Sequence, residues 1–296
     1  MTLETTVKKV AVITGASAGL GLATSILLAK HGYQVYATMR NLERKAALLH
    51  AAEATQVTVQ LQQLDVSDPT SIMQAIDIII AKEGRINILI NNAGAGFAKG
   101  IEQVTEADMQ WLTDLNYFGV VRCCKAVLPH MRKQKSGHII NITSVGGLVG
   151  QPFSEIYCAS KFAVEGFTES LASIMPTFFG INISLIEPGG IDTGLAKSAA
   201  MSTLDSSWLL DEDDEYALLF RRYLKRFKKR GQSKADAAIS QQTPQEVAEV
   251  ILAVINQDDP PLRIRTSEWA EDICRFKTAA DPDGKQQLAD VVKRYL

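Results

Sequence analysis

The chain has 296 residues, 46% hydrophobic and 22% charged, and its net charge at pH 7 is −2. This length allows one large α/β domain or two small ones, and the balanced charge argues against a nucleic-acid-binding protein. The four cysteines form no Cys-x-x-Cys pair and the four histidines lack ligand spacing, which predicts reduced thiols and no metal site. Neither a signal-peptide core nor an apolar run of about 18 residues is present, so we expect a cytoplasmic protein without a transmembrane segment.

The first apolar run, Val10 to Thr14, has the character of a buried parallel strand and leads directly into a glycine-rich turn. In that turn Gly15 permits the tight bend, Gly19 lets the backbone approach a pyrophosphate, and Gly21 lets the next helix pack on the strand. A helical stretch then continues to about His31. A strand, a glycine turn and a helix in this order point free backbone N–H groups at a phosphate and predict a dinucleotide site.

The second strand, Gln34 to Met39, ends in Arg40. In dinucleotide-binding folds, an acidic residue at the end of this strand accepts a hydrogen bond from the adenosine 2′-hydroxyl. Met39 and Arg40 occupy this place without a carboxylate, and an arginine suits a 2′-phosphate. The sequence therefore favours NADP(H) over NAD(H), although Arg40 could instead cap a surface loop.

Two further strands are expected at residues 57–64 and 86–90, and each ends in residues suited to a ligand. Asp65 follows the first, where its carboxylate could accept a hydrogen bond from an adenine amine. Asn91-Asn92-Ala93-Gly94 follows the second, and its small residues allow close approach of the backbone to a ligand or to a neighbouring strand.

A capping box at Thr105–Asp108 predicts a long helix running to about Lys133, and Asn116 lies inside it. Asparagine is a poor choice in the middle of a helix, so its presence there indicates a functional role. The following strand, residues 137–143, places Ser144 at its carboxyl end.

Tyr157 and Lys161 are four residues apart on a helix predicted over 155–173, and so lie on the same face. An ammonium group one turn away is expected to lower the pKa of the phenol, which would make the pair a proton donor and acceptor. Taken alone, the spacing is also typical of an amphipathic surface pair. A sixth strand, residues 182–186, ends in a loop that contains Pro188, Gly189, Ile191 and Thr193.

After this loop the strand–helix alternation lapses. Residues 195–242 are polar and helical, with a basic stretch at 221–230, and we expect them to form a lid over the substrate. The basic residues could form a solvated face or make weak contact with a membrane surface. A helix start at Thr243 and a strand at 260–264 follow, and a helical tail is expected at 267–296. Without linkers or repeats, the chain is predicted to be a single domain, residues 1–296.

Together these elements predict an α/β fold, a doubly wound parallel sheet of about seven strands with helices on both faces. The motifs resemble those of the short-chain dehydrogenase/reductase family, and the branch containing retinol dehydrogenases and 17β-hydroxysteroid dehydrogenases is the most similar. The residues that carry this resemblance are Thr14–Gly21, Asn91–Gly94, Asn116, Ser144, Tyr157–Lys161 and Pro188–Gly189.

The resemblance implies a role for each catalytic candidate. Tyr157 would be the general acid or base, and Ser144 would hold the substrate oxygen by a hydrogen bond. Lys161 would lower the pKa of Tyr157 and bind the nicotinamide ribose, and Asn116 would hold a water that relays protons. The cofactor-binding residues would be Gly15, Ser17, Gly19, Leu20, Gly21, Arg40, Asp65, Val66, Asn92, Gly94, Tyr157, Lys161, Pro188, Gly189, Ile191 and Thr193.

The leading hypothesis is an NADP(H)-dependent oxidoreductase acting on a lipophilic alcohol, ketone or aldehyde, such as a retinoid or steroid. Two alternatives remain open: a ketoacyl reductase of fatty acid synthesis, and a catalytically silent NADP sensor on the same fold. Apolar residues on more than one face of the helices at 105–133 and 155–173 lead us to expect a homodimer or homotetramer.

Overall fold

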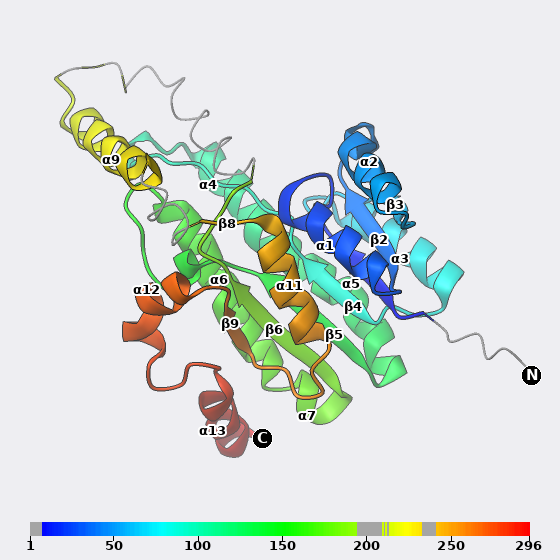
Figure 1. Ribbon diagram of the computed structural model, residues 1–296. Helices are drawn as coiled ribbons and strands as arrows, with labels where there is room; N and C mark the ends of the chain where they lie inside the picture. The colour runs from blue at the N-terminus through cyan, green and yellow to red at the C-terminus, as the bar shows by residue number, and fades with distance from the viewer. Residues whose placement is uncertain (1–7, 194–208, 210, 212, 233–240) are drawn as a thin grey trace, which may run out of the picture.

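The computed structural model describes residues 8–193, 209, 211, 213–232 and 241–296. Its main feature is a seven-stranded parallel sheet, which confirms the predicted parallel sheet of about seven strands (Figure 1). The strand order is β3-β2-β1-β4-β5-β6-β9. The strands are β1 (Val10–Ile13), β2 (Gln34–Met39), β3 (Gln60–Gln63), β4 (Ile88–Asn91), β5 (Gly137–Ile142), β6 (Ile181–Glu187) and β9 (Arg263–Arg265). A short parallel pair, β7 (Gly190–Ile191) and β8 (Gln241–Gln242), lies outside this sheet.

The order of the strands reverses between β1 and β4. The chain builds outward from β1 to β2 and β3, then returns to place β4 on the other side of β1. In open parallel sheets, ligands bind outside the carboxyl ends of the strands at such a reversal. The glycine-rich turn after β1 and the Asn91–Gly94 segment at the end of β4 therefore meet at the expected edge of the sheet.

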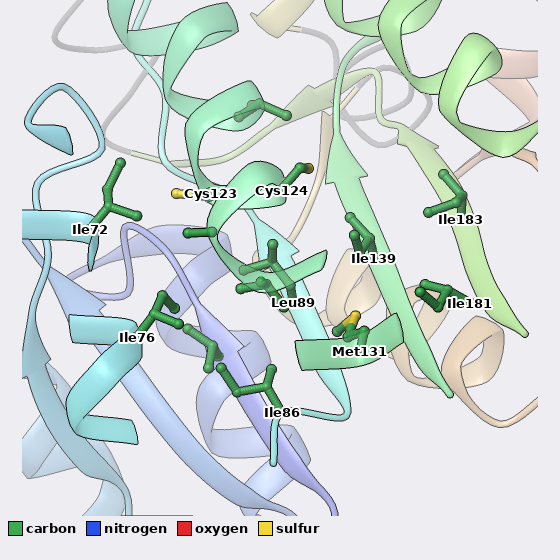
Figure 2. Packing of buried hydrophobic residues seen from close by; sticks show 14 of the residues in the cluster. Ile72, Ile76, Ile86, Leu89, Cys123, Cys124, Met131, Ile139, Ile181 and Ile183 are labelled. Carbon is green, nitrogen blue, oxygen red and sulfur yellow. The ribbon is translucent and has the colours of Figure 1, made fainter. Parts of the chain in front are cut away.

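Helices cover both faces of the sheet, and each face has its own apolar core (Figure 1). On one face lie α1 (Gly19–Lys30), α2 (Ala46–Ala54) and α11 (Pro244–Ile255). On the other lie α3 (Pro69–Glu83), α5 (Gly119–Gln134), α6 (Glu155–Ala172) and α7 (Met175–Phe179). Figure 2 shows part of this second core, with Met131 of α5 close to Leu89 and Ile139 of the sheet.

The long helix expected from Thr105 to Lys133 is present but has three parts. The capping box is confirmed, since Asp108 N donates to Thr105 Oγ1 over 3.1 Å and Thr105 N donates to the Asp108 carboxylate over 3.0 Å. Helix α4 (Glu106–Thr113) leads into η3 (Asp114–Phe118), a π-helical turn, and then into α5. Such turns insert an extra residue into a helix and are frequent at functional sites. Asn116, the residue that broke the helical pattern, lies in this turn.

The C-terminal part ends in α12 (Glu268–Thr278) and α13 (Lys285–Tyr295), which agrees with the expected helical tail. The expected last strand is shorter than the prediction and lies at the edge of the sheet as β9. Half of the expected lid, namely residues 195–208, 210, 212 and 233–240, lies outside the described residues, and the described half includes α9 (Glu215–Gln232). Within the described part of the chain, no helix is long and apolar enough to cross a membrane.

Candidate active site

The glycine-rich turn fits tightly against the end of β4. Gly15 has a φ of +69°, and a methyl group added there would lie 2.8 Å from the Cα of Ala93. Asn92 holds the turn, because its Nδ2 donates to Thr14 O over 2.8 Å and to Gly15 O over 3.2 Å. A methyl group at Gly21 would lie 2.5 Å from both Asn92 Nδ2 and Gly15 O. The side-chain amide of Asn92, which was expected to bind the cofactor, therefore holds the shape of the turn through these hydrogen bonds.

The start of α1 is suited to an anion. Its N-cap, Ala18, offers no side-chain acceptor, and its first turn contains no acidic residue. The first backbone N–H groups of the helix thus have no side-chain cap, and the helix dipole favours a negative charge beside them. Leu20 is buried under this turn and Ser17 is half-buried in it, so the residues present fit a pyrophosphate.

The loop after β6 ends next to the glycine-rich turn. A methyl group at Gly19 would lie 3.1 Å from Cγ2 of Thr193, which places Thr193 against the glycine-rich turn. Buried Pro188 accepts a hydrogen bond from Val145 N over 3.0 Å, and this ties the loop to the segment after β5. Ile191 belongs to β7 and Gly189 is half-buried just before it. These expected cofactor residues thus lie together beside α1.

Tyr157 of α6 and Ser144 at the end of β5 face each other. A hydrogen bond joins their side chains, and Ser144 Oγ also accepts from Gly146 N over 3.0 Å. Glycines border the tyrosine ring, because a methyl group at Gly96 would lie 3.4 Å from its Cδ2 and one at Gly146 would lie 3.3 Å from its Cε1. The two hydroxyl groups are therefore held side by side at the carboxyl edge of the sheet.

Lys161 lies one turn further along α6 and is 7% exposed. Its Nζ donates to the carbonyl oxygen of Ile142 over 3.0 Å and lies 5.9 Å from the centre of the Tyr157 ring. Burial lowers the pKa of Lys161 to about 8, and the charge of Glu165 opposes this. The ammonium group is thus held between the end of β5 and the catalytic tyrosine candidate.

Asn116 clamps the loop that follows β4. It is fully buried; its Oδ1 accepts from Ala95 N over 2.9 Å, and its Nδ2 donates to Ala95 O over 2.9 Å and to Ser160 Oγ over 3.1 Å. A methyl group at Gly94 would lie 3.2 Å from Asn116 Oδ1 and 3.8 Å from Lys161 Nζ. The structure therefore brings Asn116, Gly94 and Lys161 together, as the sequence motifs implied.

The pKa of Tyr157 differs from the expectation. Burial raises this pKa above its ordinary value, and the hydrogen bond with Ser144 only partly offsets the rise. The cost of a buried phenolate is the largest effect on this pKa, and the ammonium group of Lys161 is directed at Ile142 O. Tyr157 consequently carries its proton at neutral pH.

The residues expected at the adenosine end also lie along one edge. Arg40 is exposed directly after β2, and its carbonyl oxygen accepts from Gln63 Nε2 over 3.2 Å. Asp65 follows β3, where one of its carboxylate oxygens accepts from Ser67 N over 2.9 Å. Val66 is buried next to Gly119, at which a methyl group would lie 2.9 Å from Val66 Cγ2. The turn at Asp65 is thus fixed both by its own carboxylate and by packing under it.

Helix α9 packs against Phe153, which lies just before α6, through the aromatic rings of Phe220 and Tyr223. Phe220 is 1% exposed, and its ring lies edge-on to that of Phe153, 4.8 Å between centroids. Phe153 in turn accepts from Lys99 N over 3.1 Å, joining the segment before α6 to the loop after β4. Leu218 and Leu219, which precede Phe220 on the same helix, are 44% and 54% exposed. Helical periodicity turns Phe220 inward and leaves its two predecessors outside.

Sequence reasoning missed several residues that shape the site. The backbone of Ala95 holds Asn116, the backbone carbonyl of Ile142 holds Lys161, and Gly96 makes room for the Tyr157 ring. Nearly every residue type has the same backbone groups, so a sequence does not reveal which of them make these contacts. Only the alternating glycines of Gly94-Ala95-Gly96 indicated a segment that packs closely against its neighbours. Glu165, buried one turn after Lys161, could have been noticed as a carboxylate on an otherwise apolar helix face.

Comparison with known proteins agrees with this geometry. A family model described as short chain dehydrogenase matches residues 9–203. The chain is 34% identical over 282 residues to 3-ketodihydrosphingosine reductase of Bacteroides thetaiotaomicron, covering 95% of this chain and 96% of that protein. It is 40% identical to retinol dehydrogenase 8 of Bos taurus, covering 92% and 85%, and 36% identical to human 17-beta-hydroxysteroid dehydrogenase type 1, covering 95% and 84%.

Solved structures show the same fold with either nicotinamide cofactor. A short chain dehydrogenase/reductase from Burkholderia phymatum in complex with NAD is 26% identical, with a TM-score of 0.74 and 95% of each chain covered. A variant of actinorhodin polyketide ketoreductase with NADPH is 25% identical, with a TM-score of 0.74, covering 88% of this chain and 96% of that one. The glycine-rich turn at the end of β1 thus belongs to a fold that binds nicotinamide dinucleotides, and these similarities do not separate NAD from NADP.

Proposed function

Because the chain belongs to the short chain dehydrogenase family, in which nicotinamide cofactors are bound, we propose that this oxidoreductase uses NADP(H) on a lipophilic ketone, aldehyde or alcohol. The observation that carries the proposal is the convergence of Ser144, Tyr157, Lys161 and Asn116 on the loop at Gly94–Gly96, directly beside the glycine-rich turn. Since the turn fits a dinucleotide phosphate, this group of side chains lies where a bound nicotinamide ring would end.

The nicotinamide supplies or accepts the hydride when it is bound. Tyr157 acts as the proton donor to the carbonyl oxygen of the substrate, and its raised pKa keeps it protonated at neutral pH for that task. In the reverse direction Tyr157 must first lose its proton, which burial disfavours. We therefore propose that carbonyl reduction is the favoured direction near neutral pH and that alcohol oxidation gains only under alkaline conditions.

The other three residues hold charge and position. Ser144 has its Oγ fixed by Gly146 N, and so presents its hydroxyl to the same substrate oxygen as Tyr157. Lys161 keeps a positive charge next to the site and would bind the ribose hydroxyls of the cofactor. Asn116 fixes the loop at Ala95, against which the nicotinamide half of the cofactor would lie. A water at Asn116 remains our proposal for the proton relay from Lys161.

The preference for NADP(H) rests on the end of β2. Arg40 is exposed there, and the residue before it, Met39, is 2% exposed with its side chain in the core. An arginine matches a 2′-phosphate by charge-assisted hydrogen bonds, and no carboxylate on β2 competes for the 2′-hydroxyl. Asp65 and Val66 would border the adenine ring at the end of the neighbouring strand.

The lipophilic substrate class rests on the walls of the site and on the relatives. Phe153 and Phe220 pack together beside the loop that carries Gly96, and we propose that α9 belongs to a lid over the substrate. The relatives with near full-length similarity are named for a long-chain keto compound, a retinoid and a steroid. A bulky apolar carbonyl compound is the class that these names share.

A screen of NADPH oxidation tests the proposal. Purified protein would be assayed with a 3-ketodihydrosphingosine, a retinal, a 17-ketosteroid, an acetoacetyl thioester and a small aldehyde, each with NADPH and with NADH. We expect turnover with at least one bulky apolar carbonyl compound and a preference for NADPH. Turnover with the thioester alone would identify a ketoacyl reductase instead. Cofactor binding without turnover of any substrate would favour the NADP sensor.

A further inference from the structure

A cluster of buried charges lies directly behind Lys161. Arg263 of β9 donates through Nη1 to Glu165 Oε2 over 2.5 Å and to Glu187 Oε1 over 2.7 Å, and it also pairs with Glu169. The side chains of Arg263, Glu165 and Glu187 are 10%, 5% and 0% exposed. Three elements distant in the chain, α6, β6 and β9, therefore meet at one arginine.

The cluster continues toward the C-terminal helices. Arg265 of β9 pairs with Glu187 Oε2 over 3.2 Å and with Glu271 of α12 over 2.9 Å. The thiol of Cys274, also on α12, lies beside these charges, and burial raises its pKa to about 11, so it stays neutral. Removing charged groups from water costs several kcal/mol per ion, and replacing a buried ion pair with apolar residues of similar volume often leaves a protein equally stable. Stability alone is therefore a weak reason for such a cluster.

The position of Glu165 suggests a further reason. It is one helical turn after Lys161 on α6, so the two side chains lie on the same face. A methyl group at Gly147 would touch both residues, 3.1 Å from Glu165 Oε1 and 3.3 Å from Lys161 O. Gly147 belongs to η4 (Val145–Gly147), which follows Ser144. The Glu165 side chain and the backbone of Lys161 thus both lie against the segment that follows the serine.

The charges in this region do not balance if every group is ionised. The cations are Lys161, Arg263 and Arg265, and the carboxylates are Glu165, Glu169, Glu187 and Glu271. One carboxylate is in excess, and the cluster is neutral when Glu165 carries a proton. Burial, together with the charge of Glu187 and against that of Arg263, raises the pKa of Glu165 to about 8. Tyr157, the other titratable group facing Lys161, is neutral in this range.

We propose that Glu165 is a positioning residue that keeps Lys161 protonated in the alkaline range. Its carboxyl group is held by Arg263 and becomes negatively charged as the pH rises. As the pH rises toward 8, Glu165 can give up its proton, and the negative charge that results stabilises the ammonium group one turn away. Without this carboxyl group, burial lowers the pKa of Lys161 and no neighbouring negative charge opposes the change. The role rests on the proposed function, in which the protonated form of Lys161 is the form that acts.

Nitrogen NMR of the cofactor-free protein tests the charge coupling. The Nζ resonance of Lys161 would be titrated in protein labelled with ¹⁵N-lysine and assigned by its absence in Lys161→Met. In Glu165→Gln, which has the shape of a protonated glutamate, we expect the Lys161 midpoint to fall by about one pH unit, the effect of losing one nearby opposite charge. Glu169→Gln is the matched control, since Glu169 also pairs with Arg263 but is 35% exposed and lies two turns from Lys161. It should leave the midpoint unchanged.

Binding of NADPH across the pH range tests the consequence. At pH 6.5 the affinity of Glu165→Gln for NADPH should match that of the unmodified protein. As the pH is raised, the affinity of the variant should begin to decline at a lower pH than that of the unmodified protein. Glu165→Asp, which keeps the charge, should restore the alkaline limb even if Glu165→Gln proves too unstable to titrate. Equal Lys161 midpoints in the unmodified protein and both glutamate variants would overturn the inference and leave Glu165 as an anchor for β9. Failure of the unmodified protein to bind NADPH would refute the proposed function, while the NMR result would still decide the charge coupling.

Discussion

The substitution Tyr157→Phe removes the proposed proton donor and leaves the other residues of the site unchanged. The ring is bordered by Gly96 and Gly146, at contact distances that phenylalanine reproduces, so only the hydroxyl group is lost. Ser144 keeps its hydrogen bond from Gly146 N, which leaves the neighbouring backbone in place. A general acid typically contributes 10²- to 10⁴-fold to the rate, and we expect kcat to fall by about that factor, which corresponds to roughly 3–5 kcal/mol of barrier.

The assay is NADPH oxidation at saturating substrate, with NADPH affinity measured separately by fluorescence. Affinity should stay within about threefold, because the hydroxyl group makes a small net contribution to ground-state binding. Tyr36→Phe is the control, since its hydroxyl donates to Glu83 Oε1 over 2.6 Å on the outer part of the sheet. This control should lower the free energy of unfolding by about 1–3 kcal/mol without changing kcat. Turnover of Tyr157→Phe within tenfold of the unmodified protein would refute the assignment.

The remaining predictions concern cofactor, substrate and assembly. Arg40→Leu should weaken NADPH binding by about 1.5–3 kcal/mol and leave NADH binding unchanged, since only the charge-assisted hydrogen bond is lost; an equal effect on both cofactors in titration would contradict this. Phe220→Ala should raise KM at least about tenfold for a bulky apolar ketone but not for a small aldehyde, and a uniform change would refute the lid. For assembly, a groove of about 350 Å³ lies between the outer faces of α5 and α6, and Gly166 is exposed on α6 with open space where a Cβ would point. We expect a dimer or tetramer by light scattering at micromolar concentration and a smaller species for Gly166→Arg; a monomeric unmodified protein would count against the prediction.

The sequence by itself determined the parts of this protein that depend on local pattern. Short, continuously apolar runs such as Val10–Ile13 are typical of strands buried on both faces of a parallel sheet. The capping boxes at Thr105 and Thr243 determine where two helices begin. Glycine at position 15 is required by a positive φ and by Ala93 beneath it, and this requirement is visible as a motif. The doubly wound parallel sheet and the catalytic candidates were predicted from these signals because residue type and spacing carry them, whereas the order of the strands came from the structure.

Tertiary structure alone decided how the candidates act on one another. Lys161 was expected to lower the pKa of Tyr157, but its ammonium group is held by a backbone carbonyl at Ile142, and burial has the larger effect. Asn116 departs from helical pattern because a π-turn directs its amide to the backbone of Ala95. Arg263 comes within 2.5 Å of Glu165, from which it is separated by 98 residues, through the return of the last strand to the sheet edge. The electrostatic free energy of a buried charge depends on every neighbour that replaces water, and folding, rather than chain order, selects those neighbours.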